Sequence, residues 1–161
     1  MSRLEDKYRT LVQALSNRYG DRLKTVLLFG SQARREARRS SDHDIFVVID
    51  NLPRDPLARQ RDVRETLLTI IDSLPGSVSF VAKTPEEVEI NLTPLMVDIC
   101  VDGVCLFGKS FIDEYCQKAL AALQQAGLKR RRIAGTWMWV FPRLPARNWE
   151  LNWDGYRERP G

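Results

Sequence analysis

A chain of 161 residues, 43% of them hydrophobic, can form one domain around a single core, and one domain is what we expect. The first residues are charged and no apolar run reaches the length of a bilayer, which argues against a membrane protein and favours the cytoplasm. The net charge is +4, and 19 of the 25 basic residues are arginine, the side chain best suited to bidentate phosphate contacts, so anionic ligands are favoured.

Helices and strands are expected in alternation through the first half of the chain. Apolar residues at steps of three and four predict a helix over residues 4–19, which Gly20 ends. A short run of β-forming residues predicts a buried strand at 25–29, and the polar stretch at 32–39 is long enough for about two helical turns. A second apolar run, at 44–49, predicts a second core strand.

The middle of the chain carries stronger helix signals. After a loop with two prolines, a helical pattern runs through residues 63–74, and a third strand is expected at 77–83. Thr84 is a suitable N-cap and is followed by proline and then by Glu87 at the third helical position, which marks the start of another helix. The nearly continuous apolar run at 92–102 is compatible with a helix or a strand, and we favour a helix.

The composition changes in the last third of the chain. Residues 104–107 predict a fourth strand, and Gly108 precedes a long helix with one apolar side that Gly127 ends. Four consecutive basic residues at 129–132 then precede a tryptophan-rich stretch, in which residues 137–141 could add an edge strand.

Together these elements predict an α/β (α+β) fold, with a small mixed β-sheet flanked by helices. The strands at 25–29 and 44–49 are apolar enough to need cover on both faces, so we expect them to be adjacent central strands. Residues 1–108 are expected to form the main domain, and residues 109–161 to add a helix and an aromatic arm packed on it. The three cysteines form no CxxC pair and are expected to be reduced and buried, and a single histidine excludes a His-rich metal site.

Two carboxylates stand at the start of the second core strand. Asp42 and Asp44 are two residues apart. Because side chains alternate along a strand, both are expected to project from one face, about 7 Å apart. Such a pair can hold one or two hard cations, and Mg²⁺ prefers carboxylate, water and phosphate oxygens. Taken alone the pair is weak support for a metal site, since Asp-x-Asp also occurs at solvated strand ends.

A Gly-Ser dipeptide at the end of the first core strand strengthens the prediction of a site. Gly30 lets the backbone approach a phosphate, Ser31 supplies a hydroxyl, and amides at a helix N-terminus attract anions. A simple hairpin bend is the alternative. Ten residues separate Ser31 from Asp42, and four arginines among them could neutralise phosphate charge: Arg34, Arg35, Arg38 and Arg39.

The sequences Phe-Gly-Ser-Gln-Ala-Arg at 29–34 and Ser-Asp-His-Asp at 41–44 resemble the signature of the minimal nucleotidyltransferases of the DNA polymerase β superfamily. The resemblance covers residues 4–107 and implies a polymerase β-like nucleotidyltransferase fold. The small members of this family resemble antitoxins that modify a partner protein with adenylate, and the partner is commonly a small helical toxin.

The resemblance also implies roles for individual residues. Gly30 and Ser31 would hold the triphosphate of a nucleotide, with Arg34 as the basic residue beside it. Asp42 and Asp44 would bind Mg²⁺ and form the catalytic pair. The implied reaction moves a nucleoside monophosphate onto an acceptor hydroxyl, and ATP is the expected nucleotide.

Two positions depart from the pattern of the family. A third carboxylate is common on the next core strand, where this sequence offers only Ser79. Asp98 is a substitute by character, either as a ligand or, on the helix that we favour, as a structural carboxylate. His43 stands where the family has an apolar residue, and alternation points it away from both aspartates, which favours a structural role.

Two other functions compete with nucleotidyl transfer. A weak or inactive chain of the same fold could bind nucleotide and hold a partner through its arginine-rich face or aromatic arm, and the missing third carboxylate favours this alternative. The basic run at 129–132 beside Trp137 and Trp139 could instead bind single-stranded nucleic acid. A basic helix end followed by core tryptophans explains the same residues, so nucleic acid is not the expected partner.

Overall fold

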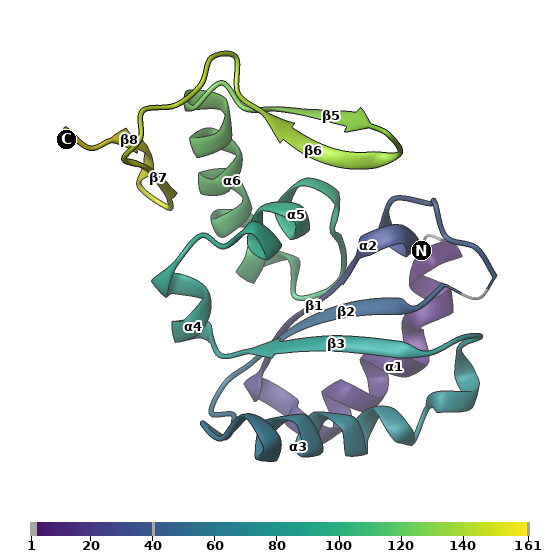
Figure 1. Ribbon diagram of the computed structural model, residues 1–161. Helices are drawn as coiled ribbons and strands as arrows, with labels where there is room; N and C mark the ends of the chain where they lie inside the picture. Colours follow the sequence, from purple (N-terminus) through teal and green to yellow (C-terminus); the bar gives the residue numbers. More distant parts are fainter. Residues whose placement is uncertain (1–2, 40, 161) are drawn as a thin grey trace.

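The computed structural model describes residues 3–39 and 41–160, and within them it contains a four-stranded sheet with the order β3-β2-β1-β4 (Figure 1). The bounds are Leu23–Phe29 for β1, His43–Ile49 for β2, Val78–Lys83 for β3 and Val104–Phe107 for β4. β1 pairs antiparallel with β2 and β4, whereas β2 pairs parallel with β3. The sheet is therefore mixed, and the two strands predicted to be central are adjacent.

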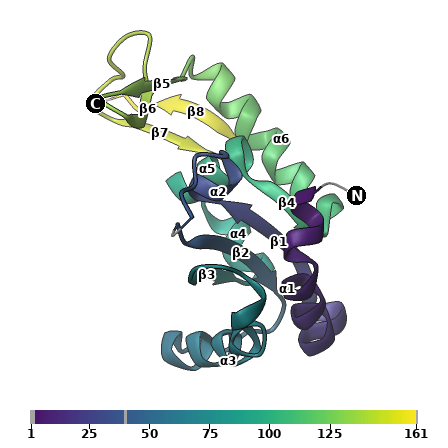
Figure 2. The same cartoon turned by 90° about the vertical axis from the view of Figure 1, so that its right-hand side faces the viewer.

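Helices cover both faces of this sheet (Figures 1 and 2). The long helices are α1 (Arg3–Tyr19) and α3 (Pro56–Leu68) on one face, and α5 (Pro94–Asp102) and α6 (Lys109–Gln125) on the other. Alternate residues of β2 enter the two cores, with Val47 on the α1 and α3 side and Phe46 on the α5 and α6 side. Burial on both faces explains why β1 and β2 are nearly continuous apolar runs.

Shorter elements connect these layers. α2 (Gly30–Ala33) follows β1 directly, and α4 (Pro85–Ile90) begins with the predicted capping box, formed by Thr84 and Glu87. Single 3₁₀ turns lie at Gly20–Arg22 and Ile71–Ser73. The ambiguous run at 92–102 contains α5, so the preference for a helix is confirmed. None of the described helices is long and apolar enough to cross a membrane.

Three local expectations are wrong. The stretch at 32–39 does not form two helical turns, because α2 ends at Ala33 and Arg35 adopts a left-handed φ of 58°. α3 ends at Leu68, six residues before the predicted end, and the Thr69 hydroxyl bonds the Thr66 carbonyl there. The three cysteines carry free thiols but are only partly buried, since they lie at the margins of the cores.

The C-terminal part forms two hairpins, and residues 137–141 do not join the main sheet. The hairpins are β5 (Lys129–Ile133) with β6 (Thr136–Val140), and β7 (Trp149–Asn152) with β8 (Gly155–Glu158). The basic run is therefore a strand and not a helix end. The basic run pairs with β6 because the chain reverses in a two-residue turn between the two strands. In this turn Ala134 and Gly135 adopt the positive φ values of 49° and 81° that a tight hairpin turn requires.

Candidate functional site

Gly30 and Asp44 lie against each other where the two central strands meet α2. Phe29, the last residue of β1, is the register partner of Asp44 in β2. Gly30 follows with a φ of 71°, and a Cβ built on it would overlap the Asp44 carboxylate. The backbone conformation therefore favours glycine, and a larger residue would displace the Asp44 carboxylate. The Gly-Ser turn and one carboxylate of the predicted pair are thus in direct contact.

Asp42 and Asp44 are close enough to repel each other. Burial is the main cause that raises the pKa of Asp44, and the charge of Asp42 raises that pKa further. Asp42 is exposed and accepts a hydrogen bond from the Ser77 hydroxyl. No sequence motif predicted this contact. Two carboxylates that repel each other are a donor set that fits Mg²⁺, because a cation with oxygen preference would relieve the repulsion.

Arg34 lies at the end of α2 and is held there by carboxylates. Its Nε is 3.0 Å from Glu36 Oε2, and its Nη1 is 3.9 Å from Asp102 Oδ2. Ser31 is the second residue of α2, and its hydroxyl has no hydrogen-bond partner within the described part of the chain. Carboxylates of this chain therefore fix the orientation of the Arg34 guanidinium.

The same two carboxylates anchor the β5–β6 hairpin beside α2. Glu36 accepts hydrogen bonds from Trp137 Nε1 at 3.2 Å and from Arg132 Nη1 at 3.4 Å, and Asp102 pairs with Arg130. The Arg130 guanidinium lies 4.9 Å from the ring centre of Trp137. The hairpin aromatics thus contact arginines of this chain, which weakens the alternative that they stack on nucleic acid.

Ser79 stands opposite Asp44 in the parallel pairing of β2 and β3, where a third carboxylate is common in the family. Asp98 lies on α5, is partly buried, and precedes Asp102 by about one helical turn. Among residues 3–39 and 41–160, no group of three or more His, Cys, Asp or Glu side chains could hold a metal ion. The residue opposite Asp44 on β3 is therefore a serine, and Asp98 lies outside the sheet.

His43 is fully buried on the opposite side of β2 from the carboxylates. Its Nδ1 lies 2.7 Å from Tyr8 Oη, and its Nε2 lies 2.6 Å from the Pro75 carbonyl oxygen. Since a carbonyl only accepts, Nε2 carries a proton and donates to Pro75, and Nδ1 shares a second hydrogen bond with the Tyr8 hydroxyl. Burial raises the pKa of Tyr8 to about 12, which keeps that hydroxyl protonated. His43 therefore has the structural role that the sequence favours.

A Gly-Ser turn packed on one of two neighbouring carboxylates, in a mixed sheet with helices on both faces, is the arrangement that the resemblance to nucleotidyltransferases predicts. The chain belongs to the polymerase beta nucleotidyltransferase family, whose sequence profile matches residues 10–111. This match confirms the predicted membership and the predicted fold.

Individual relatives agree with this membership. A candidate protein adenylyltransferase of Methanocaldococcus jannaschii, MJ1305, is 30% identical over 89 residues, and the match covers 55% of this chain and 60% of that protein. This chain therefore spans less than two thirds of that relative.

Two solved structures are similar in fold. A chain from a toxin–antitoxin crystal structure with AMP-PNP has a TM-score of 0.53 and 25% identity, over 74% of this chain and 86% of that one. A chain from the complex of a tri-AMPylated Shewanella oneidensis HEPN toxin with an MNT antitoxin has a TM-score of 0.50 and 21% identity, over the same shares of the two chains. The second likeness supports the fold alone.

Proposed function

We propose that the protein is a magnesium-dependent adenylyltransferase that moves AMP from ATP onto a hydroxyl of a partner protein. The observation that carries the proposal is the contact between Gly30 and the Asp44 carboxylate, which joins the turn for the triphosphate and the carboxylate pair in one site. The similarity to the toxin–antitoxin chain solved with AMP-PNP supports ATP as the nucleotide. The Methanocaldococcus relative supports a protein as the acceptor.

In this reaction the acceptor oxygen forms a bond to the α-phosphorus of ATP, the bond from that phosphorus to the bridging oxygen breaks, pyrophosphate leaves, and the acceptor proton passes to solvent. Gly30 and Ser31 would bind the terminal phosphates, and Arg34 would balance their charge. Asp42 and Asp44 would hold Mg²⁺, which supplies charge neutralisation to the triphosphate. Such transfer depends on positioning more than on covalent help from the protein.

For the biological role, we infer an antitoxin that modifies a small helical toxin. The support is the likeness to a chain of a toxin–antitoxin pair. A second candidate function is a nucleotide-binding module with weak or lost transfer, and the observation that favours it is Ser79 at the place opposite Asp44.

Incubation with ATP labelled at the α-phosphate, Mg²⁺ and the protein encoded beside this gene separates the two functions. The adenylyltransferase is expected to leave covalent label on the partner, and the Asp42→Asn/Asp44→Asn double variant is expected to leave none. If ATP binds in the presence of Mg²⁺ and the partner binds but acquires no label, the protein is a binding module.

A further inference from the structure

The outer edge of β3 is open. Within the described residues β3 pairs only with β2, and it stands last in the order of the sheet. The His43 N–H donates to the Ser77 carbonyl at 2.9 Å, so the main-chain groups of Ser77 face β2. Because these groups alternate in direction along a strand, the N–H and C=O of Val78 and Phe80 face outward. The edge therefore offers unpaired donors and acceptors.

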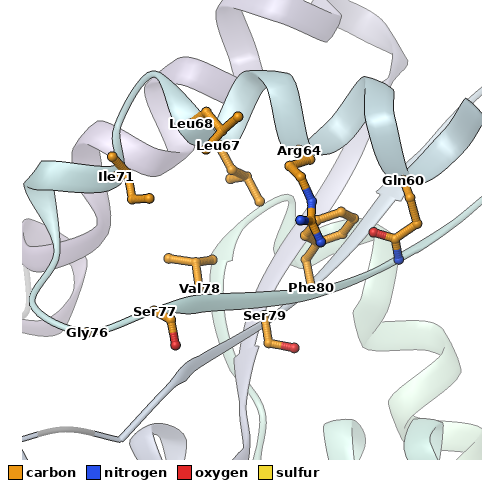
Figure 3. A pocket seen from close by; sticks show the side chains of 10 residues that line it. All are labelled: Gln60, Arg64, Leu67, Leu68, Ile71, Gly76, Ser77, Val78, Ser79 and Phe80. Carbon is orange, nitrogen blue, oxygen red and sulfur yellow. The ribbon is translucent and has the colours of Figure 1, made fainter. Parts of the chain in front are cut away.

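A groove runs along this edge on the α3 side. It has a volume of about 550 Å³ and is lined by apolar side chains of α3, β3 and the 3₁₀ turn at Ile71–Ser73, and by the polar residues Gln60, Arg64, Ser77 and Ser79. Figure 3 shows Val78 and Phe80 pointing from β3 towards α3, where Leu67, Leu68 and Ile71 meet them. Leu68 is 55% exposed and Ile71 is 51% exposed, so the groove has apolar walls that this chain leaves uncovered.

The charge along the edge is positive towards Lys83. Arg64 lines the groove, and Arg54, Arg59 and Lys83 line a second hollow beside the Lys83 half of β3, whereas Asp42 lies at Ser77, near the other end. Arg59 pairs with Glu87 at 2.8 Å, whereas Arg54 and Arg64 have no ion pair within residues 3–39 and 41–160. A segment with an acidic residue at the end that lies beside Lys83 would complement this surface.

The edge is also continuous with the carboxylate site. Ser77 and Ser79 point away from α3 (Figure 3), and they contact Asp42 and pair with Asp44 respectively. A strand added beside β3 would lie about 4.8 Å away, and its side chains would alternate between the two faces. One set would enter the groove, and the other would lie beside the two serines.

We propose that an extended segment of the partner protein adds to β3 as a fifth strand, with alternate apolar side chains in the α3–β3 groove, an acidic residue at the end beside Lys83 and the intervening side chains on the carboxylate face. The identity of those intervening side chains as acceptors rests on the proposed function, whereas strand addition itself does not. The segment is thereby oriented along the site by main-chain hydrogen bonds rather than by its own sequence.

A synthetic peptide tests this directly. The probe is an acetylated heptapeptide amide with valine at positions 2, 4 and 6 and threonine at positions 3 and 5. It has glutamate at both ends, so that either chain direction places one glutamate beside Lys83. Saturable binding below about 1 mM is expected, with NMR shifts and slower hydrogen exchange at the amides of Val78 and Phe80. Two control peptides carry N-methyl groups, one on the valines and one on the threonines. In an added strand only the valines or only the threonines direct their N–H groups towards β3. The peptide that is methylated on that set must fail to bind, because the methyl groups remove these donors.

Variants of the protein test the groove. Leu68→Glu and Ile71→Glu should each weaken peptide binding at least tenfold, whereas Leu57→Glu, on the same helix but outside the groove and 75% exposed, should not. ATP binding should change less than twofold in all three, so loss of the proposed function and loss of this surface are separable. The proposal is overturned by the absence of saturable binding, by equal binding of both methylated peptides, or by a dimer of this chain that the peptide dissociates.

Discussion

The substitution Gly30→Ala tests the contact between Gly30 and Asp44. Gly30→Ala adds a Cβ that meets the carboxylate at a positive φ, and we expect it to cost at least about 2 kcal/mol and to weaken Mg²⁺-dependent ATP binding at least tenfold. Gly20→Ala is the matched control, because Gly20 has a φ of 53° and nothing within 4 Å of an added Cβ. It should cost about 1 kcal/mol and leave ATP binding unchanged. Thermal melts and calorimetry on both variants measure this, and equal losses of binding would contradict the contact.

The raised pKa of Asp44 predicts opposite changes in stability and binding. A carboxyl whose pKa is raised by folding stabilises the native state below its unfolded pKa, near 3.8, and loses this contribution as the pH rises through the raised value. Asp44→Asn should therefore raise the melting temperature at pH 7, with a gain that shrinks towards pH 4, while ATP binding in Mg²⁺ falls at least tenfold. Unchanged or lower stability at pH 7 would show that Asp44 is not destabilised by burial and by Asp42.

Residues of the site were predictable to the extent that their partners are near in sequence. Asp42, Asp44 and Gly30 belong to two short motifs. Alternation predicted that the two carboxylates lie close together, and the effect of the Asp42 charge on the pKa of Asp44 agrees with this, although Asp42 precedes β2. The carboxylates that hold Arg34 and the hairpin were not predictable, because Glu36 and Trp137 are 101 residues apart and no local period links them.

At the scale of elements, the helix at 92–102 decides which side chain occupies the third position. A strand would have brought Asp98 into the sheet, but the Thr93 cap and the proline after it start α5 instead, and Ser79 remains opposite Asp44. The start of α4 was predicted correctly from its own cap at Thr84. The β5–β6 hairpin was not, because Ala134 at positive φ gives no recognisable turn signal.

Restoring a carboxylate on β3 should therefore increase activity. We expect Ser79→Asp to raise Mg²⁺-dependent adenylyl transfer about tenfold, because the new carboxylate would stand opposite Asp44. Asp98→Asn should change transfer less than twofold. Rates of label incorporation at saturating Mg²⁺ measure both variants. A loss of transfer in Asp98→Asn with an intact fold would show that Asp98, on α5, acts as the third carboxylate.

At the scale of the whole molecule, the C-terminal arm packs on the family domain. Trp153 belongs to the core on the α5 and α6 side, its Nε1 donates to the Val88 carbonyl at 3.2 Å, and its ring meets Tyr115 at 5.5 Å. We propose that residues 109–161 fold together with residues 1–108 as one unit, although the family match ends at residue 111.

Two tryptophans of the arm test this unity. Trp153→Ala should lower the free energy of unfolding by about 2–3 kcal/mol and leave a single transition, because it empties part of the shared core. Trp149 lies in the β7–β8 hairpin and is 41% exposed, so Trp149→Ala should lower the free energy of unfolding by only about 1 kcal/mol. Urea unfolding followed by far-UV circular dichroism distinguishes them, and two separate transitions in the parent protein would mean that the arm folds independently.

Calorimetric titration of ATP in the presence of Mg²⁺ tests the central claim most directly, namely that Asp42 and Asp44 and the Gly-Ser turn form one metal-dependent nucleotide site. The parent protein is expected to bind ATP with Mg²⁺ and to lose at least tenfold in affinity when the ion is chelated. The Asp42→Asn/Asp44→Asn double variant, which keeps the shape of both side chains but removes both charges, is expected to bind at least about a hundredfold more weakly. Binding of ATP by the double variant as tight and as Mg²⁺-dependent as that of the parent would contradict the site.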